Sequence, residues 1–293
     1  MKRTYVYAGI AIFIWSTLAT VSKLLLGSMS SYQVLMWSSL FAALALLVVN
    51  VINGNIKFLQ GYRVKDYLLT LFICLPGTFI YYIFLYLGTA RMSASQAFII
   101  NYLWPIMSVL FACIILKEKL TARKGIAFVL SFLGVLTVAG ADLLSFNVDT
   151  LLGAVLCMLA AVSYGAFTAL NQKWHYNEQV SLMLAFFVSF LLSLLFNALT
   201  GDWAAIGVPH LLGFAWNGIF VMAVATVTWA LALKSGDTAR ISNLAYITPF
   251  LSLVWTFFIL KEPITPWSLI GLAVIVLGIF IQLKDKKAPK DAA

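Results

Sequence analysis

Charge is scarce in this sequence. Only 10% of the 293 residues are charged, whereas 63% are hydrophobic. Soluble globular chains carry about 25% charged and ~45–50% apolar residues, so this composition excludes a soluble globule. Cysteine is scarce too: Cys74, Cys113 and Cys157 all lie within apolar runs, without disulfide or metal-ligand spacing. They are interpreted as small core residues.

Ionisable groups are also missing from the apolar runs. All ten carboxylates and both histidines fall in or beside predicted loops. A proton-coupled pump usually needs such a group at membrane depth, so a side-chain proton relay is disfavoured. The chain has no phosphate-binding loop, no zinc-protease motif and no nucleophile elbow. We therefore predict no enzyme activity, no cofactor and no metal.

The apolar residues fall in blocks of about 20, the length at which a helix crosses a bilayer. Such blocks predict an all-α membrane protein, because helices satisfy their own backbone groups in lipid. Ten transmembrane helices are expected, at 5–26, 32–52, 67–87, 94–116, 124–141, 151–170, 180–198, 212–233, 239–260 and 265–283. The run after Met1 is too long for a signal peptide and is taken as the first span.

The net charge of +9 comes from basic residues between the spans and at the tail. With the N-terminus inside, sixteen of the 19 Lys and Arg residues are cytoplasmic. Two, Arg91 and Lys261, are outside, and Lys23 lies within a span. This split predicts cytoplasmic termini and explains the basic charge without a nucleic-acid partner. Residues 284–293 are expected to form a disordered cytoplasmic tail.

The chain contains an internal repeat. Residues 97–134 and 241–278 align without a gap at a shift of 144 and share eleven identical positions. They include Pro105/Pro249, Gly134/Gly278 and the Leu-Lys-Glu ends at 116–118 and 260–262. Self-similarity over this length indicates a duplicated half.

A shift of 144 residues advances the chain by five spans, an odd number. The second copy must then cross the membrane in the opposite sense, which is the inverted-repeat architecture of secondary transporters. The predicted units are 1–145 and 146–283, each a five-helix repeat. A substrate site is expected between them, near the midplane of the membrane.

These features resemble the drug/metabolite transporter superfamily, specifically its EamA-type members with ten helices. The resemblance is carried by the paired prolines, the paired Leu-Lys-Glu ends, Gly134 and Gly278. Gly9 with Trp15-Ser16 and Gly153 with Tyr164-Gly165 add to it. The pentapeptide at 101–105, Asn-Tyr-Leu-Trp-Pro, is similar to that of the YddG-like subgroup. That resemblance implies a bacterial inner-membrane exporter of amino acids, aromatic ones included.

The two prolines mark the expected site. Each removes a helix hydrogen bond, at the carbonyls of Asn101 and Ala245. A structural kink absorbed by neighbouring helices and a bent helix lining a cavity are both open interpretations. The polar and aromatic residues nearby could equally be interhelical contacts or lipid-facing filler. The residues expected to contact substrate are Lys23, Tyr82, Tyr86, Asn101, Tyr102, Trp104, Pro105, Tyr164, Trp229, Asn243, Tyr246 and Pro249.

Lys23 has two possible roles. It can extend toward the lipid headgroups from the outer end of the first span, or attract a carboxylate at the outer mouth of a cavity. The cavity itself is expected to be neutral and aromatic, which suits a zwitterion with an apolar side chain.

Three functions therefore compete. The leading hypothesis is an amino-acid exporter working by alternating access, as a monomer or dimer, with only a small-molecule substrate and membrane lipids as partners. The alternatives are an exporter of drugs or lipophilic cations, and a receptor or scaffold that does not transport.

Overall fold

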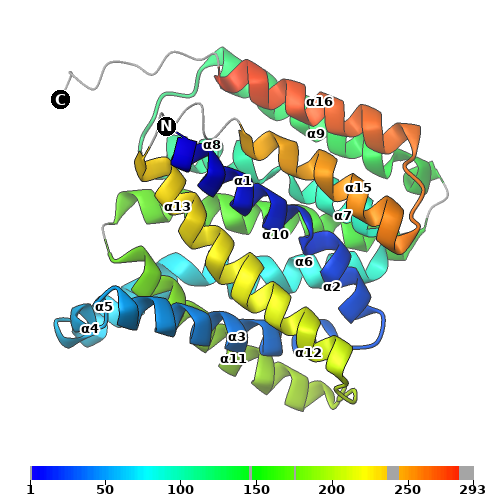
Figure 1. Ribbon diagram of the computed structural model, residues 1–293. Coiled ribbons are helices and arrows are strands. Elements are labelled where there is room, and N and C mark those ends of the chain that lie inside the picture. The colour runs from blue at the N-terminus through cyan, green and yellow to red at the C-terminus, as the bar shows by residue number, and fades with distance from the viewer. Residues whose placement is uncertain (1, 145–146, 175, 236–243, 284–293) are drawn as a thin grey trace.

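The computed structural model describes residues 2–144, 147–174, 176–235 and 244–283 (Figure 1). Every regular element in these ranges is a helix. The elements are α1 (Lys2–Ser16), α2 (Leu18–Leu26), α3 (Ser31–Ile52), α4 (Lys57–Gln60), α5 (Val64–Cys74), η1 (Leu75–Gly77), α6 (Phe79–Arg91), α7 (Ala94–Asn101), α8 (Trp104–Ile115), α9 (Ala122–Leu144), α10 (Val148–Lys173), α11 (Glu178–Thr200), α12 (Val208–Ala215), η2 (Trp216–Val224), α13 (Ala225–Ser235), η3 (Ala245–Ile247), α15 (Thr248–Leu260) and α16 (Pro266–Leu283).

Within the described residues, seven helical segments are long and apolar enough to cross a membrane. They are Arg3–Leu26, Ser31–Ile52, Val64–Arg91, Ala94–Ile115, Val148–Lys173, Glu178–Thr200 and Val208–Ala232. Ala245–Leu260 and Pro266–Ile281 are shorter apolar helices, and the range expected at 124–141 lies within α9. Residues 239–243 of the expected ninth span lie outside the described residues, as does the expected tail at 284–293.

The proline positions differ from the expected kinks. The fourth span is two helices: α7 ends at Asn101, and α8 starts at Trp104 with Pro105 in its first turn. In the second half, the short turn η3 precedes α15, whose first turn holds Pro249. Proline is tolerated at the start of a helix, where its missing N–H leaves no helix bond unmade. The prolines therefore begin new helices at breaks instead of bending continuous ones.

The two Leu-Lys-Glu ends have the same backbone conformation. Lys117 and Lys261 both adopt the left-handed region with φ of 58°. The Glu118 N–H donates to the Ala112 carbonyl at 3.4 Å, and the Glu262 N–H donates to the Thr256 carbonyl at 3.3 Å. Each end is thus the same seven-residue capping turn, and the two donors, like the two acceptors, lie 144 residues apart in the sequence.

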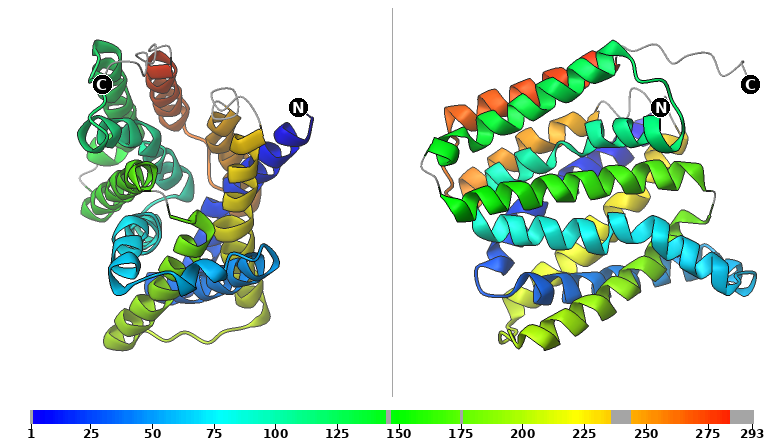
Figure 2. Two further views of the ribbon diagram at one scale, coloured as in Figure 1. Left: turned by 90° about the vertical axis from the view of Figure 1, so that its left-hand side faces the viewer. Right: turned by 180° about the vertical axis from the view of Figure 1, so that it is seen from behind.

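Contacts between helices follow the duplication as well. α9 packs on α16, and α3 packs on α11, so equivalent helices of the two halves pair with each other. Likewise, α6 of the first half packs on α10 of the second, and α13 of the second half packs on α1 of the first. Because α13 is the repeat equivalent of α6, and α10 is the equivalent of the first span, these are the same contact made once by each half. Figure 2 shows α9 and α16 side by side at one edge of the molecule.

Small residues allow α9 and α16 to approach closely. A Cβ placed on Gly271 would lie 2.6 Å from the Gly134 carbonyl oxygen and 2.4 Å from a Val138 methyl carbon. A Cβ on Gly278 would lie 2.9 Å from the Ala127 carbonyl oxygen. Because Gly134 and Ala127 are the repeat equivalents of Gly278 and Gly271, the two crossings are images of each other. Close backbone contact of this kind is the main source of helix association in lipid.

This packing predicts that Gly271→Ala destabilises the protein. The added methyl group overlaps backbone, which cannot move aside as a side chain would, and overpacking of this kind costs ~1–3 kcal/mol. Gly125→Ala is the matched control on α9, because nothing lies within 4 Å of its added Cβ. Thermal unfolding in detergent should show a lower midpoint for Gly271→Ala and an unchanged or higher one for Gly125→Ala. Equal midpoints would contradict the close crossing.

Candidate functional site

A cavity of about 610 Å³ lies between the two halves. A volume of this size is typical of small-molecule sites. Its lining residues are Trp15, Leu18, Gly77, Tyr81, Tyr82, Phe98, Asn101, Tyr102, Trp104, Pro105, Ser108, Val109, Tyr164, Phe167, Thr168, Asn171, Gln172, Glu178, Leu182, Phe186, Met222, Thr226, Trp229, Ala230, Ala245, Tyr246 and Thr248.

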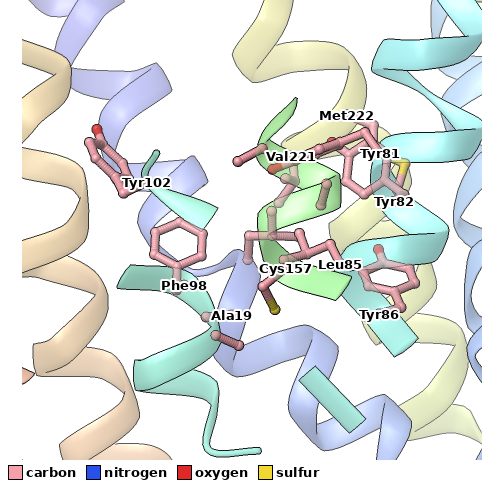
Figure 3. Packing of buried hydrophobic residues seen from close by; sticks show 14 of the residues in the cluster. Ala19, Tyr81, Tyr82, Leu85, Tyr86, Phe98, Tyr102, Cys157, Val221 and Met222 are labelled. Atoms are coloured by element: carbon pink, nitrogen blue, oxygen red, sulfur yellow. The ribbon is translucent and has the colours of Figure 1, made fainter. Parts of the chain in front are cut away.

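Aromatic rings in edge and tilted contacts form much of the wall. The ring centroid of Tyr164 lies 4.8 Å from that of Tyr81 and 5.3 Å from that of Trp104. Tyr81 and Tyr82 are 4.7 Å apart and nearly perpendicular. In Figure 3, Tyr81 and Tyr82 lie apart from Tyr102, which comes from the break between α7 and α8. Rings locked against one another in this way form a rigid, preformed surface.

A second aromatic pair joins the first span to the eighth. The rings of Trp15 and Trp229 have centroids 5.4 Å apart. The Trp15 indole N–H donates to the carbonyl of Val221 at 3.2 Å, within the π-helical segment η2. This bond fixes the Trp15 ring and leaves its face available to the cavity.

Asn101 and Thr248 are buried polar residues of the wall, and the Thr248 hydroxyl has no protein partner. For Asn101 the contacts are more specific. Its side chain is 2% exposed, and its Nδ2 donates to the Tyr81 hydroxyl at 3.0 Å. Its Oδ1 has no protein partner. An unpaired buried acceptor costs about 1–3 kcal/mol, so this atom favours any ligand that can donate a hydrogen bond to it.

Tyr102 links the two halves at the second proline. Its hydroxyl donates to the carbonyl of Ala245, the carbonyl that Pro249 cannot bond. A carbonyl facing a polar cavity is one of the two open interpretations of the proline. In the structure the Ala245 carbonyl accepts from the Tyr102 hydroxyl of the other repeat and from the Thr248 N–H in its own turn. Burial of the hydroxyl and the carbonyl is thereby compensated by their bond to each other.

Eight of the twelve residues expected to contact substrate line the cavity: Tyr82, Asn101, Tyr102, Trp104, Pro105, Tyr164, Trp229 and Tyr246. Tyr86 does not. It is fully buried among helices, with its hydroxyl 3.5 Å from the Asn217 Nδ2. Pro249 supports the first turn of α15 outside the lining. Asn243 lies outside the described residues.

Several lining residues were not identified from the sequence. Tyr82 and Tyr86 lie four residues apart, a spacing that places both on one helix face and does not point to Tyr81, yet Tyr81 is the partner of Asn101. Thr248 had a signal in the repeat, because it is the equivalent of Trp104 and precedes Pro249. Trp15 had one too, as part of the first-span motif.

The cavity reaches the protein surface at the end of α10 and the start of α11, where Gln172 and Glu178 are exposed. Its lining includes Asn171 and Gln172 at the end of α10 and Glu178 at the start of α11. The Asn171 Nδ2 lies 3.4 Å from a Glu178 carboxylate oxygen. The expectation of a wholly neutral cavity is therefore wrong at this mouth, because the helix start was treated as a loop remote from the site.

The cavity is held closed at its other end, where α2, α6 and α7 meet. The lining contributed by α6 stops at Tyr82, and beyond it the carbonyls of Thr89 and Met92 accept bonds from the Lys23 ammonium at 2.8 and 2.6 Å. In this structure the Lys23 ammonium is therefore bound to carbonyls at the closed end, and Lys23 is not among the residues that line the cavity. Helix ends leave carbonyls unpaired, and a lysine is a suitable donor for them.

Glu262 closes this end from the second half. Its carboxylate accepts from the backbone N–H groups of Ala94 and Ser95, at 2.8 and 2.9 Å, and from the Ser95 hydroxyl at 2.8 Å. It therefore caps the first turn of α7, where unpaired N–H groups and the helix dipole favour an anion. Lys23 is close enough to add an attractive charge to this cluster. The first, third and fourth spans of the first repeat and the turn after α15 in the second repeat are thus joined at one point.

The sequence profile of the EamA-like transporter family matches this chain twice, at residues 2–140 and 151–283. A protein of Clostridium kluyveri described as an uncharacterized transporter is 25% identical over 306 residues, covering 99% of this chain and 96% of its own length. The uncharacterized transporter YdeK of Bacillus subtilis is 26% identical over 237 residues, covering 78% and 81%. One solved structure superimposes with a TM-score of 0.68 at 20% identity, covering 95% of this chain and 96% of that one, which shows a shared fold.

The one-sided opening predicts side-dependent cysteine labelling. In a Cys113→Ser background the remaining Cys74 and Cys157 are buried and should stay unlabelled. Val109→Cys lines the open cavity, whereas Ala97→Cys in α7 replaces a residue that is 1% exposed. A membrane-impermeant maleimide should modify Val109→Cys from one face only and Ala97→Cys from neither. Labelling of both positions at similar rates would contradict the closure.

Proposed function

The chain belongs to the EamA-like transporter family, and we propose that it moves small organic molecules across the membrane by alternating access through the central cavity. The observation that carries the proposal is a cavity between the repeats that is open at one end and closed at the other. Alternating access requires a site that each repeat can expose in turn. Proteins described as transporters align along nearly the whole chain.

We propose ten membrane crossings in two inverted repeats, residues 1–145 and 146–283, with both termini in the cytoplasm of a bacterial cell. The two matches to the family profile, the identical turns at Lys117 and Lys261, and the exchangeable helix contacts support the duplication. The distribution of lysine and arginine supports the orientation. The open mouth beside Glu178 then faces the cytoplasm, which suits export.

We propose a neutral amino acid, aromatic or otherwise apolar, as the substrate. Its side chain would pack on the rings of Tyr81, Trp104 and Tyr164, and Asn101 offers a polar contact. A lipophilic cation is the second candidate, favoured by the same aromatic faces and by the carboxylate of Glu178 at the mouth. In either case flux is proposed to run down the substrate gradient. A receptor or scaffold would show no flux at all.

Counterflow in proteoliposomes should distinguish these functions. Exchange of labelled phenylalanine without a pH gradient supports the amino-acid proposal, whereas exchange of a labelled quaternary ammonium ion alone supports the second candidate. Trp104→Ala should lower the rate by about tenfold, because a wall of the site is lost. Trp267→Ala is the matched control, since this tryptophan is 53% exposed on α16. Equal rates for the two variants would show that Trp104 does not contribute to the substrate site.

The closed end should open when the cap of α7 is weakened. Glu262→Gln keeps the shape of the side chain but removes its charge and one acceptor oxygen, at a cost of about 1.5–3 kcal/mol for charge-assisted bonds. Its repeat equivalent, Glu118→Gln, is the control: Glu118 is about half exposed and pairs with Lys124 at 3.0 Å, a contact worth ~0–1 kcal/mol. In a background that also carries Ala97→Cys, the Glu262 variant should gain maleimide labelling and the Glu118 variant should not. The reverse pattern would show that Glu262 does not hold this end closed.

A further inference from the structure

The described lining of the cavity carries charge of one sign only. Glu178 is its carboxylate, and lysine, arginine and histidine do not occur among the lining residues that the structure describes. The carboxylate of a bound substrate would need cationic or hydrogen-bonding partners, because a buried charge must be paired or hydrogen-bonded. A substrate carboxylate thus finds no cationic partner in this wall, whereas a substrate ammonium finds an attractive charge at the mouth.

Backbone donors for a carboxylate are also in short supply at the helix breaks. The N–H groups of Leu103 and Thr248 are bonded to the carbonyls of Ile100 and Ala245 in their own turns. Pro105 and Pro249, which follow, have no N–H. The starts of α8 and α15 therefore differ from the helix N-termini that bind anions, where several N–H groups point at the ligand.

Acceptors suited to an ammonium group are present instead. The Asn101 Oδ1 is buried and has no protein partner, whereas the Nδ2 of the same side chain donates to the Tyr81 hydroxyl. The Tyr81 ring packs on Tyr164, which packs on Trp104, so aromatic faces surround this part of the wall. Aromatic faces attract cations within about 6 Å, most strongly where water is excluded. A neutral acceptor and these rings can together replace much of the hydration of an ammonium ion.

We infer that the site recognises its substrate by a protonated amine bound at the Asn101 side-chain oxygen, with an apolar body against the rings, and does not require a carboxylate. The inference rests on the proposed function and narrows its substrate class to primary amines, of which amino acids are one kind. It also allows one cavity to take an amino acid or a primary organic amine, because both present a protonated amine beside an apolar group.

The test compares three ligands of the same apolar body on the full chain in lipid nanodiscs. Phenylalanine carries both charges, phenethylamine only the amine, and 3-phenylpropionate only the carboxylate. Phenethylamine should bind within about tenfold of phenylalanine, and 3-phenylpropionate at least ~100-fold more weakly, as expected when a charged hydrogen bond has no counterpart. Binding of 3-phenylpropionate as tight as that of phenethylamine would overturn the inference.

Variants locate the recognised group. Asn101→Leu should weaken phenethylamine about tenfold and leave 3-phenylpropionate unchanged, and Asn101→Asp should strengthen phenethylamine by supplying a full charge. Glu178→Gln should weaken phenethylamine in a salt-dependent way, because the mouth loses its charge. Asn197→Leu is the matched control: Asn197 is fully buried, also has one unpartnered side-chain atom, and lies outside the cavity lining. It should leave all three affinities unchanged.

The outcomes separate the two proposals. If Asn101→Asp left phenethylamine binding unchanged or weaker, the amine would bind elsewhere, and the inference would fail while transport stood. If none of the three ligands bound the native protein and phenylalanine counterflow were absent, the proposed amino-acid function would fail first and the inference with it.

Discussion

Backbone groups at the interruptions of its helices constrain this protein more than any other feature. A continuous helix satisfies its own N–H and carbonyl groups in lipid, but a broken one leaves some without partners, and lipid supplies none. In this protein the partner often comes from the other half. The Ser163 hydroxyl donates to the Pro76 carbonyl at 2.6 Å, Tyr102 donates to the Ala245 carbonyl, and Glu262 accepts from the first turn of α7. The two repeats are joined through their breaks.

The same breaks produce the site. Where a helix is interrupted, side chains from the turn and the following helix project into the interior at angles that a regular helix does not allow. Tyr102 and Trp104 come from one break, and Tyr246 and Thr248 from its repeat equivalent. Between them lies a cavity instead of a packed core. The closed end of the cavity depends on Glu262, which caps the start of α7. The open end carries Glu178 in the cavity lining.

The fold was predicted more completely than the site, for a physical reason. The length of the apolar runs, the charge of the loops and the 144-residue repeat are properties of whole segments. A prediction from them does not depend on interpreting any single residue correctly. Membrane depth alone does not fix the direction of a side chain, because lipid and protein interior are equally apolar. Tyr82 and Tyr86 therefore looked equivalent, yet only Tyr82 lines the cavity. The partners of Lys23 were also beyond prediction, because Thr89 and Met92 contribute carbonyls, which leave no signature in a sequence.

The shared bonding of the breaks has a consequence for biogenesis. A ribosome delivers the first half to the membrane before the second exists, since domains emerge in order from the N-terminus. Until α10 is inserted, the Pro76 carbonyl lacks Ser163, and until the turn after α15 is made, the first turn of α7 lacks Glu262. Ser163 and Glu262, in the second half, thus complete hydrogen bonds of the first half only after they have been synthesised. Assembly is directional along the chain, and the last repeat to be synthesised determines when the first is finished.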